Sequence, residues 1–361
     1  MIRFNEKDWD RVQQNYRLWR ENKLGRPILP CVFYGADPKR NCPSTPSLAF
    51  GNVNDFSITP DQIIDRIDYD LSCMEFHGDA YPWVNMSHFG PGVVAAFLGA
   101  KLENNENTVW FHPQKVLPIE DLHFEFDDNN VWFNRIRDIY IAAMKRWKGD
   151  VVMSMTDLGG ILDILATFRG TDNLLMDLYD SPEDVARLVG EVQNLWLKCY
   201  DAFNEVLKGS RGYSDWGTIL SEEPSYMIQS DFSYMISPGF FDTYVKDEVN
   251  STAGHMKNAF YHLDGVGQLP HLDSLLSLPN LQGIQWVPGE GEPVTRDWSE
   301  VYAKISKAGK KLQVYYNLEK YMDEILKVID RPDVLIKMQF GYGIGEKEEV
   351  LRKLYGFGVE K

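Results

Sequence analysis

Residues 259–286, AFYHLDGVGQLPHLDSLLSLPNLQGIQW, give the clearest indication of the fold. The runs Ala259–His262 and Leu281–Trp286 are short, apolar and contain aromatic or β-branched side chains, which is typical of strands. The stretch between them mixes polar and apolar residues in the manner of an amphipathic helix. Strand, helix and strand in this order predict a parallel sheet with both faces buried.

The same alternation recurs from about residue 130 to the end of the chain, and weaker strand signals precede it. Eight predicted strands result: Ile28–Phe33, Asp79–Val84, Val151–Thr156, Met227–Ser230, Ala259–His262, Leu281–Trp286, Leu312–Tyr316 and Val334–Met338. Tyr213–Trp216 competes for a place among them. We therefore expect an α/β fold, and within it a (β/α)8 TIM barrel with an elaborated N-terminal segment.

Two helix starts are well marked. Ser181 precedes Pro182 and two acidic residues, and Ser237 precedes Pro238. Serine at the N-cap followed by proline in the first turn is a frequent helix beginning, because the serine oxygen accepts a free backbone N–H and proline lacks one. Helices are expected to begin at both places.

Length and composition are those of one folded domain. Residues 1–361 include 44% hydrophobic and 13% aromatic residues, enough for a large core, and barrels of this length have a single core. Neither a repeat nor a Pro/Gly/Ser-rich linker divides the sequence, and residues 37–54 read as a loop. A single domain over residues 1–361 is expected.

The charge balance limits the partners. The 53 acidic residues outnumber 37 basic ones, giving a net charge of -16, which argues against nucleic acid and anionic membranes as partners. The charged N-terminal stretch is unlike a signal peptide, so a cytoplasmic protein is expected. We expect the protein to be a monomer or a homodimer. The cysteines lie far apart without a CxxC pair and predict reduced thiols: Cys31, Cys42, Cys73 and Cys199.

Polar and aromatic residues follow the predicted strands, where a parallel barrel places its active site. The candidate site residues are Asn85, His88, Asp157, Asp215, Trp216, Asp231, His262, Asp264, Gln285, Trp286, Tyr315, Asn317, Gln339 and Tyr342. Because they occupy corresponding strand ends, we expect them to face one cavity that binds a small-molecule substrate.

His262 and Asp264 have the most chemical potential. Their i, i+2 spacing at a strand end directs both side chains to the same side of the sheet. Such a pair can bind a divalent metal or act as an acid/base couple. The structural alternative is a histidine hydrogen-bonded to a turn aspartate, and the sequence leaves both open.

The other candidates serve substrate binding in this interpretation. Asp157 begins a DLGG turn whose backbone amides can hold an anion, although an aspartate can equally cap the next helix. Trp216, Trp286, Tyr315 and Tyr342 can form an aromatic wall for a flat ligand, or fill the core. Asn85, His88, Gln285 and Gln339 complete the predicted substrate-binding set.

Several of these segments resemble the uroporphyrinogen decarboxylase superfamily, which includes corrinoid-dependent methyltransferases. The segments that carry the resemblance are DAYPWVNMSHFGPGVVAAFLGAKL, DLYDSPEDVARLV, IQSDFSYMISPGFFDTYVKDEV, FYHLDG, GIQWVPGEGEP and IKMQFGYGI. The resemblance as a whole extends over most of the chain and is thinnest before residue 75. The resemblance implies a TIM barrel and two candidate activities.

The decarboxylase branch matches in part. Asp231 matches the corresponding residue of that branch. The histidine of the branch's Gly-His-Gly motif is replaced by Tyr342 in Gly341–Gly343. The arginine-bearing RQAGR segment of the family, which grips substrate carboxylates, has no counterpart. A carboxylated tetrapyrrole needs cationic side chains to bind its carboxylates. The absence of these arginines therefore argues against a lyase that decarboxylates uroporphyrinogen in porphyrin biosynthesis. Decarboxylation of uroporphyrinogen or a related tetrapyrrole stays the alternative.

The methyltransferase branch matches at His262. Its His-x-Cys motif holds zinc, and Asp264 stands here in place of the first cysteine. Histidine and oxygen ligands favour Lewis-acid activation of an oxygen substrate. The leading hypothesis is a methyltransferase in which His262 and Asp264 bind zinc and a partner protein carries the corrinoid. A third hypothesis is a barrel that binds a tetrapyrrole without turnover.

Overall fold

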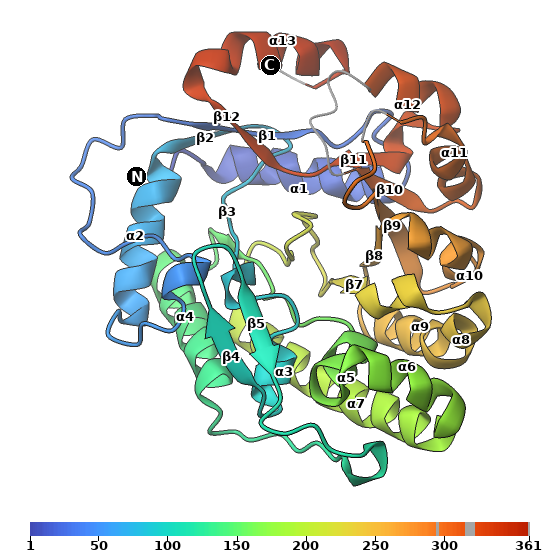
Figure 1. Cartoon of the computed structure of the whole chain (residues 1–361). Helices are drawn as coiled ribbons and strands as arrows, with labels where there is room; N and C mark the ends of the chain where they lie inside the picture. Colours follow the sequence, from blue (N-terminus) through green and yellow to red (C-terminus); the bar gives the residue numbers. More distant parts are fainter. Residues whose placement is uncertain (294–295, 315–321, 360–361) are drawn as a thin grey trace.

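The computed structural model describes residues 1–293, 296–314 and 322–359 as a mixed α/β fold (Figure 1). The strands are β1 (Pro30–Tyr34), β2 (Met74–Gly78), β3 (Trp83–Val84), β4 (Lys101–Asn104), β5 (Val109–His112), β6 (Val152–Met153), β7 (Met227–Gln229), β8 (Ala259–Asp264), β9 (Leu281–Val287), β10 (Lys311–Val314), β11 (Leu335–Lys337) and β12 (Phe340–Gly343).

Helices separate most of these strands. The α-helices are α1 (Glu6–Arg20), α2 (Pro60–Ser72), α3 (Val94–Phe97), α4 (Val131–Trp147), α5 (Ile161–Arg169), α6 (Thr171–Asp180), α7 (Pro182–Leu207), α8 (Pro238–Tyr244), α9 (Lys246–His255), α10 (Leu272–Leu276), α11 (Ser299–Lys307), α12 (Met322–Val328) and α13 (Lys347–Gly356). A short 3-10 helix, η4 (Asp231–Met235), follows β7 directly.

A five-stranded parallel sheet forms the C-terminal half. Its strand order is β11-β10-β9-β8-β7, and α9, α10 and α11 lie along its outer side (Figure 1). The register places His262 beside Gln285 and Gln285 beside Gln313. Three polar residues therefore occupy one row across three neighbouring strands, whereas most of the residues around them in the sheet are apolar.

The N-terminal half contributes smaller sheets. β1 pairs in parallel with β12 and antiparallel with β2, β3 pairs in parallel with β6, and β4 and β5 form an antiparallel pair. Backbone hydrogen bonds also join Ile28, just before β1, to Leu335 and Lys337 of β11, and Met155, just after β6, to Ser214. Parallel pairing therefore occurs in both halves of the chain.

Strands form at each of the eight predicted positions, within a few residues at their ends. Tyr213–Trp216 makes only an isolated bridge, from Tyr213 to Ser221, and forms none of the strands described. Helices α7 and α8 begin at the two predicted prolines, and Ser237 Oγ accepts the Phe240 N–H. Tyr315 and Asn317 lie outside the described residues.

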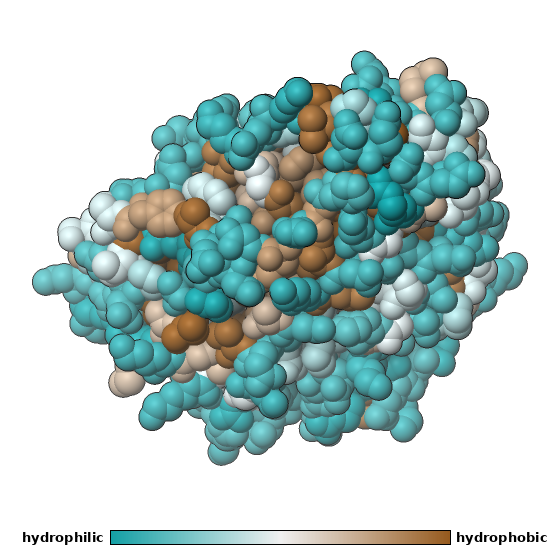
Figure 2. Space-filling model, turned by 90° about the horizontal axis from the view of Figure 1, so that it is seen from below, coloured by the Kyte–Doolittle hydropathy of each residue, from teal (hydrophilic) through white to brown (hydrophobic). Residues whose placement is uncertain are grey.

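Apolar side chains fill the space between the sheets and the surrounding helices, and the largest buried ones include Trp19, Trp286 and Tyr140. On the face seen in Figure 2, hydrophilic residues cover most of the surface and hydrophobic residues form patches between them. Within the described ranges, no helix combines the length and the apolar composition of a membrane crossing.

Candidate active site

A cleft of about 500 Å³ lies at the carboxyl ends of β8 and β9. Its lining residues include Trp83, Asn85, Ser87, Asp157, Trp216, His262, Asp264, Gly289, Glu290 and Met338. The carboxyl ends of parallel strands are where barrels and open α/β sheets bind their ligands. Five of the predicted site residues meet here: Asn85, Asp157, Trp216, His262 and Asp264.

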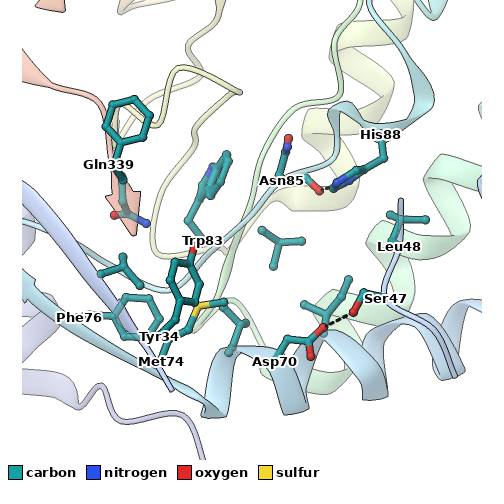
Figure 3. Close-up of a pocket in the computed structure, with 15 residues that line it drawn as sticks. Tyr34, Ser47, Leu48, Asp70, Met74, Phe76, Trp83, Asn85, His88 and Gln339 are labelled. Carbon is teal, nitrogen blue, oxygen red and sulfur yellow. Dashed lines mark hydrogen bonds between the residues drawn. The ribbon is translucent and has the colours of Figure 1, made fainter. Parts of the chain in front are cut away.

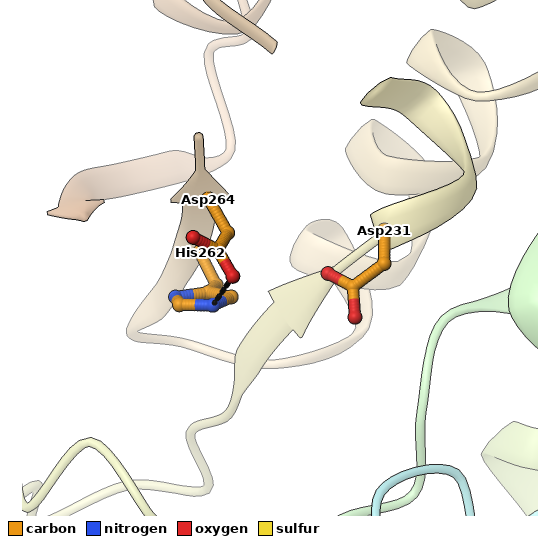
Figure 4. Close-up of side chains that lie close together, drawn as sticks. All are labelled: Asp231, His262 and Asp264. Atoms are coloured by element: carbon orange, nitrogen blue, oxygen red, sulfur yellow. Dashed lines mark ion pairs between the residues drawn. The ribbon is translucent and has the colours of Figure 1, made fainter. Parts of the chain in front are cut away.

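Three potential metal ligands converge beside this cleft, and two of them, His262 and Asp264, line it. His262 and Asp264 stand two positions apart on β8 and project to the same side, and Asp231 begins η4 immediately after the neighbouring strand β7 (Figure 4). One ligand atom from each residue lies within 4.8 Å of the other two. His262 Nε2 is 3.6 Å from Asp264 Oδ2. The predicted pair thus gains Asp231 as a third member.

A row of amide side chains fixes the His262 imidazole. Gln313 Nε2 donates to the Gly217 carbonyl at 2.6 Å, Gln285 Nε2 donates to Gln313 Oε1 at 2.6 Å, and His262 Nδ1 is hydrogen-bonded to Gln285 Oε1. Because the Gly217 carbonyl can only accept a hydrogen bond, it fixes the orientation of both amides. The Gln285 oxygen then faces His262, so that Nδ1 is the protonated nitrogen. Nε2 consequently faces Asp264 and Asp231 with its lone pair available.

The charges around His262 favour the protonated, positively charged form of its imidazole ring. Burial opposes the imidazolium, but the hydrogen bond that it donates to Asp264 and the charges of Asp231 and Asp264 outweigh that effect, and the pKa of His262 is raised. Partial loss of solvation and the nearby Asp264 charge raise the pKa of Asp231, against the opposing effect of His262. A cation bound among the three residues would relieve the repulsion between the carboxylates.

Two buried carboxylates lie beside this group. Burial, followed by the Asp231 charge, raises the pKa of Asp157 to about 6 and that of Asp163 to about 7. Asp157 Oδ1 accepts hydrogen bonds from Gly159 N and Gln229 Nε2. Asp163 accepts the backbone N–H groups of Asp231 and Phe232, and so holds the start of η4 in place. Asp157, which lines the cleft, can exchange a proton near neutral pH.

Aromatic rings and unpaired donors complete the wall. Trp216 meets His262 edge to face, with ring centroids 4.8 Å apart and an interplanar angle of 89°. The indole N–H groups of Trp83 and Trp216 are buried and make no hydrogen bond within the part of the chain that the structure describes. Both are suited to a ligand that carries a hydrogen-bond acceptor.

Two other predicted residues, His88 and Gln339, lie beside this site. Asn85 lines the cleft and also a second, more apolar cavity, where His88 and Gln339 are found. The His88 ring bonds to the Asn85 carbonyl at 3.2 Å, and the Gln339 amide bonds to the backbone of Tyr81 at 3.3 Å. Gln285 is buried and does not line the cleft, but its hydrogen bond to His262 Nδ1 positions the imidazole that does.

Two of the predicted aromatic residues, Trp286 and Tyr342, are not among the lining residues described for the cleft. Trp286 is fully buried and packs against Trp298 under α11, because successive strand residues face opposite sides and Gln285 takes the inner one. Tyr342 packs against Phe33, and Lys337 Nζ donates to its hydroxyl at 2.6 Å. The expectation that these two aromatic residues face the substrate is therefore corrected.

Sequence reasoning missed Gln313, Asp163 and Trp83 as contributors. Gln313 and Trp83 lie in predicted strands, and a polar glutamine inside the apolar run LQVYY was a usable signal. Asp163 lies in α5, where an aspartate in the first turn reads as a helix-end residue. Its role depends on a contact with η4, which no local pattern reveals.

No protein-family model matches this chain, and no curated protein matches it either. The resemblance to the uroporphyrinogen decarboxylase superfamily stays a prediction.

Proposed function

We propose that this protein is a metal-dependent methyltransferase that moves a methyl group between the oxygen of a small substrate and a corrinoid carried by a partner protein. The observation that carries the proposal is the group Asp231, His262 and Asp264, with His262 Nε2 directed at the two carboxylates by the amide row. The family resemblance suggests methyl transfer as the reaction class, and the three potential ligand side chains suggest that a metal is bound.

Zinc suits this donor set. Catalytic zinc is held by three protein ligands with a fourth position open, and its ligand distances of about 2.0–2.2 Å place tetrahedral donors roughly 3.4 Å apart. The 3.6 Å between His262 Nε2 and Asp264 Oδ2 is close to that spacing. A histidine that donates its second ring N–H to an oxygen acceptor is the usual arrangement around a bound metal.

Each cleft residue then has a task. Zinc bound by the three residues would act as a Lewis acid toward the substrate oxygen. Asp157, with a pKa near 6, supplies or receives the proton at that oxygen. The Trp216 ring restricts the His262 face of the cleft and, with Trp83, limits where the substrate can lie.

The fold part of the proposal is a closed (β/α)8 barrel. The bonds from Ile28 to Leu335 and Lys337, and from Met155 to Ser214, support a continuous ring. The Asp215 carboxylate also accepts the Met227 N–H, which bridges the remaining interval before β7. In such a barrel the cleft is the mouth, and a partner protein that carries the corrinoid would dock over it.

The alternative, decarboxylation of a carboxylated tetrapyrrole, has weaker support. Asp157, Asp264 and Glu290 line the cleft, and neither lysine nor arginine stands among its described lining residues. Tyr342, the replacement for the family's histidine, is engaged by Lys337 away from this cleft. A polyanionic substrate would meet repulsion here, whereas a neutral oxygen compound would not.

The test is a methyl-transfer assay with zinc-loaded protein and methylcob(III)alamin, in which formation of cob(I)alamin is followed by its spectrum with neutral alcohols and phenols as acceptors. We expect turnover that His262→Ala abolishes and that His123→Ala, a change of an exposed histidine, retains. Loss of carboxylates from uroporphyrinogen by the wild-type protein would instead establish the alternative.

A further inference from the structure

A second cavity adjoins the metal cleft. It has a volume of about 220 Å³ and lies between β1, β2, α2 and the loop that contains Ser47 and Leu48 (Figure 3). Apolar side chains form most of its wall, among them Leu48, Ile67, Met74 and Phe76. An apolar cavity of roughly 150 Å³ is large enough for benzene, so this one can hold a six-membered ring with a small substituent.

The polar groups of this cavity carry little free charge. The Asp70 carboxylate accepts a hydrogen bond from Ser47 Oγ at 2.8 Å and forms an ion pair with Arg66 Nε at 2.9 Å. Burial lowers the pKa of His88, so its ring is neutral at neutral pH. The Gln339 amide is bonded to backbone atoms of Tyr81. An uncharged ligand can therefore enter without leaving a charge unpaired.

The second cavity and the metal cleft share two residues. Trp83 and Asn85 line both, and the Trp83 ring stands at the edge of the cavity in Figure 3. The Trp83 indole N–H has no hydrogen-bond partner within the described chain. A molecule with one end at His262 and the other beside Ile67 would pass this ring.

We propose that the second cavity binds the uncharged, ring-sized apolar part of the substrate while the substrate oxygen lies in the metal cleft. This rests on the proposed function and names the substrate class: a compact neutral molecule with an apolar ring and an oxygen substituent. Specificity then comes from the β1, β2 and α2 wall, and reactivity from the strand ends of β7 and β8.

Calorimetric titration with p-cresol tests the proposal without any methyl transfer. p-Cresol is neutral at pH 7 and is ring-sized, and myo-inositol is the ring-sized polar control. Leu48→Trp fills the cavity, Ile67→Phe fills it from α2, and Leu117→Trp is the matched control at another half-buried loop leucine. We expect the first two variants to weaken p-cresol binding at least about tenfold and the control to stay within about twofold.

Equal binding to all variants, no p-cresol binding to the wild type, or equally tight binding of myo-inositol would overturn the proposal. Near-ultraviolet circular dichroism identifies any variant that fails to fold, and the other filling variant then decides the result. The titration uses protein without added metal, so its result does not depend on zinc binding. Failure of the cavity and failure of the metal site therefore give different results.

Discussion

The His262 imidazole shows how single residues define this site. Its two nitrogens have different neighbours: Gln285 Oε1 accepts a hydrogen bond from the Nδ1–H, and Asp264 lies beside Nε2. Because the direction of the amide row is fixed by the Gly217 carbonyl, the tautomer is set by residues from three separate segments. The ligand nitrogen is thus presented before any metal arrives.

His262→Ala should remove stoichiometric zinc binding. The variant loses the only nitrogen among the three ligands, so we expect zinc affinity to fall more than about 100-fold, while the fold persists because the side chain is partly exposed. Competition with a chromophoric chelator measures the affinity, and His123→Ala serves as control. Unchanged affinity in His262→Ala would exclude this residue as a ligand.

Gln313→Leu tests the amide row. The change leaves the Gly217 carbonyl and Gln285 Nε2 without partners and frees the imidazole to change tautomer. Outer hydrogen-bond partners of metal ligands are typically worth about 10–100-fold in affinity, and we expect a loss of that size. The ¹⁵N shifts of His262 should show a mixture of tautomers.

The matched control for that change is Gln282→Leu, which replaces an exposed glutamine on β9. It should leave both zinc affinity and the His262 shifts unchanged. If Gln313→Leu keeps a single tautomer and wild-type affinity, the positioning role is refuted.

At the scale of elements, strand periodicity explains both the successful and the failed predictions. The apolar runs predicted β7 to β11, because a strand buried on both faces needs apolar residues throughout. The same runs do not reveal which residues face inward: Gln285 and Trp286 are adjacent, and only the register with β8 and β10 assigns Gln285 to the site. That register depends on distant chain segments.

Gly283→Ala should destabilise the sheet. A Cβ at Gly283 in β9 would lie 2.3 Å from the Phe260 ring and 2.7 Å from the Lys311 carbonyl oxygen, so a backbone atom must move. Overpacking of this kind costs about 1–3 kcal/mol. Urea denaturation measures the loss.

Gly190→Ala is the opposite case on α7. A Cβ there meets no heavy atom within 4 Å, and alanine favours a helix interior over glycine by about 1 kcal/mol. We expect a gain in the free energy of unfolding of that order. A loss in Gly190→Ala, or none in Gly283→Ala, would contradict this packing of β9 and α7.

Glu248→Gln on α9 should stabilise the protein increasingly as the pH rises. Burial raises the pKa of Glu248 to about 8 although Thr252 donates a hydrogen bond to it. The folded state holds this proton where the unfolded state has lost it, so the wild type loses stability from about pH 5 to 8. The neutral glutamine avoids that loss.

Urea denaturation at pH 5, 6.5 and 8 tests this prediction. The advantage of Glu248→Gln over the wild type should grow across the three pH values, whereas Asp247→Asn, an exposed neighbour on the same helix, should show no such trend. A constant difference would mean that Glu248 is ionised in the folded protein.

At the scale of the whole molecule, the arrangement of strands places negative charge at one point. Asp157 and Asp264 line the cleft from two different strand ends, Asp231 lies beside it within 4.8 Å of His262 and Asp264, and the described lining residues offer neither lysine nor arginine to balance them. The sequence indicated each aspartate from its place after a strand. It could not indicate their mutual distance, which depends on how the sheets join around the cleft.

The central claim is that this group of residues holds zinc through nitrogen and oxygen alone. X-ray absorption at the zinc K-edge of the zinc-loaded protein tests it most directly. We predict one shell of nitrogen and oxygen scatterers at about 2.0–2.1 Å with an imidazole contribution that His262→Ala removes. A sulfur shell at about 2.3 Å, or a spectrum unchanged in His262→Ala, would contradict the account.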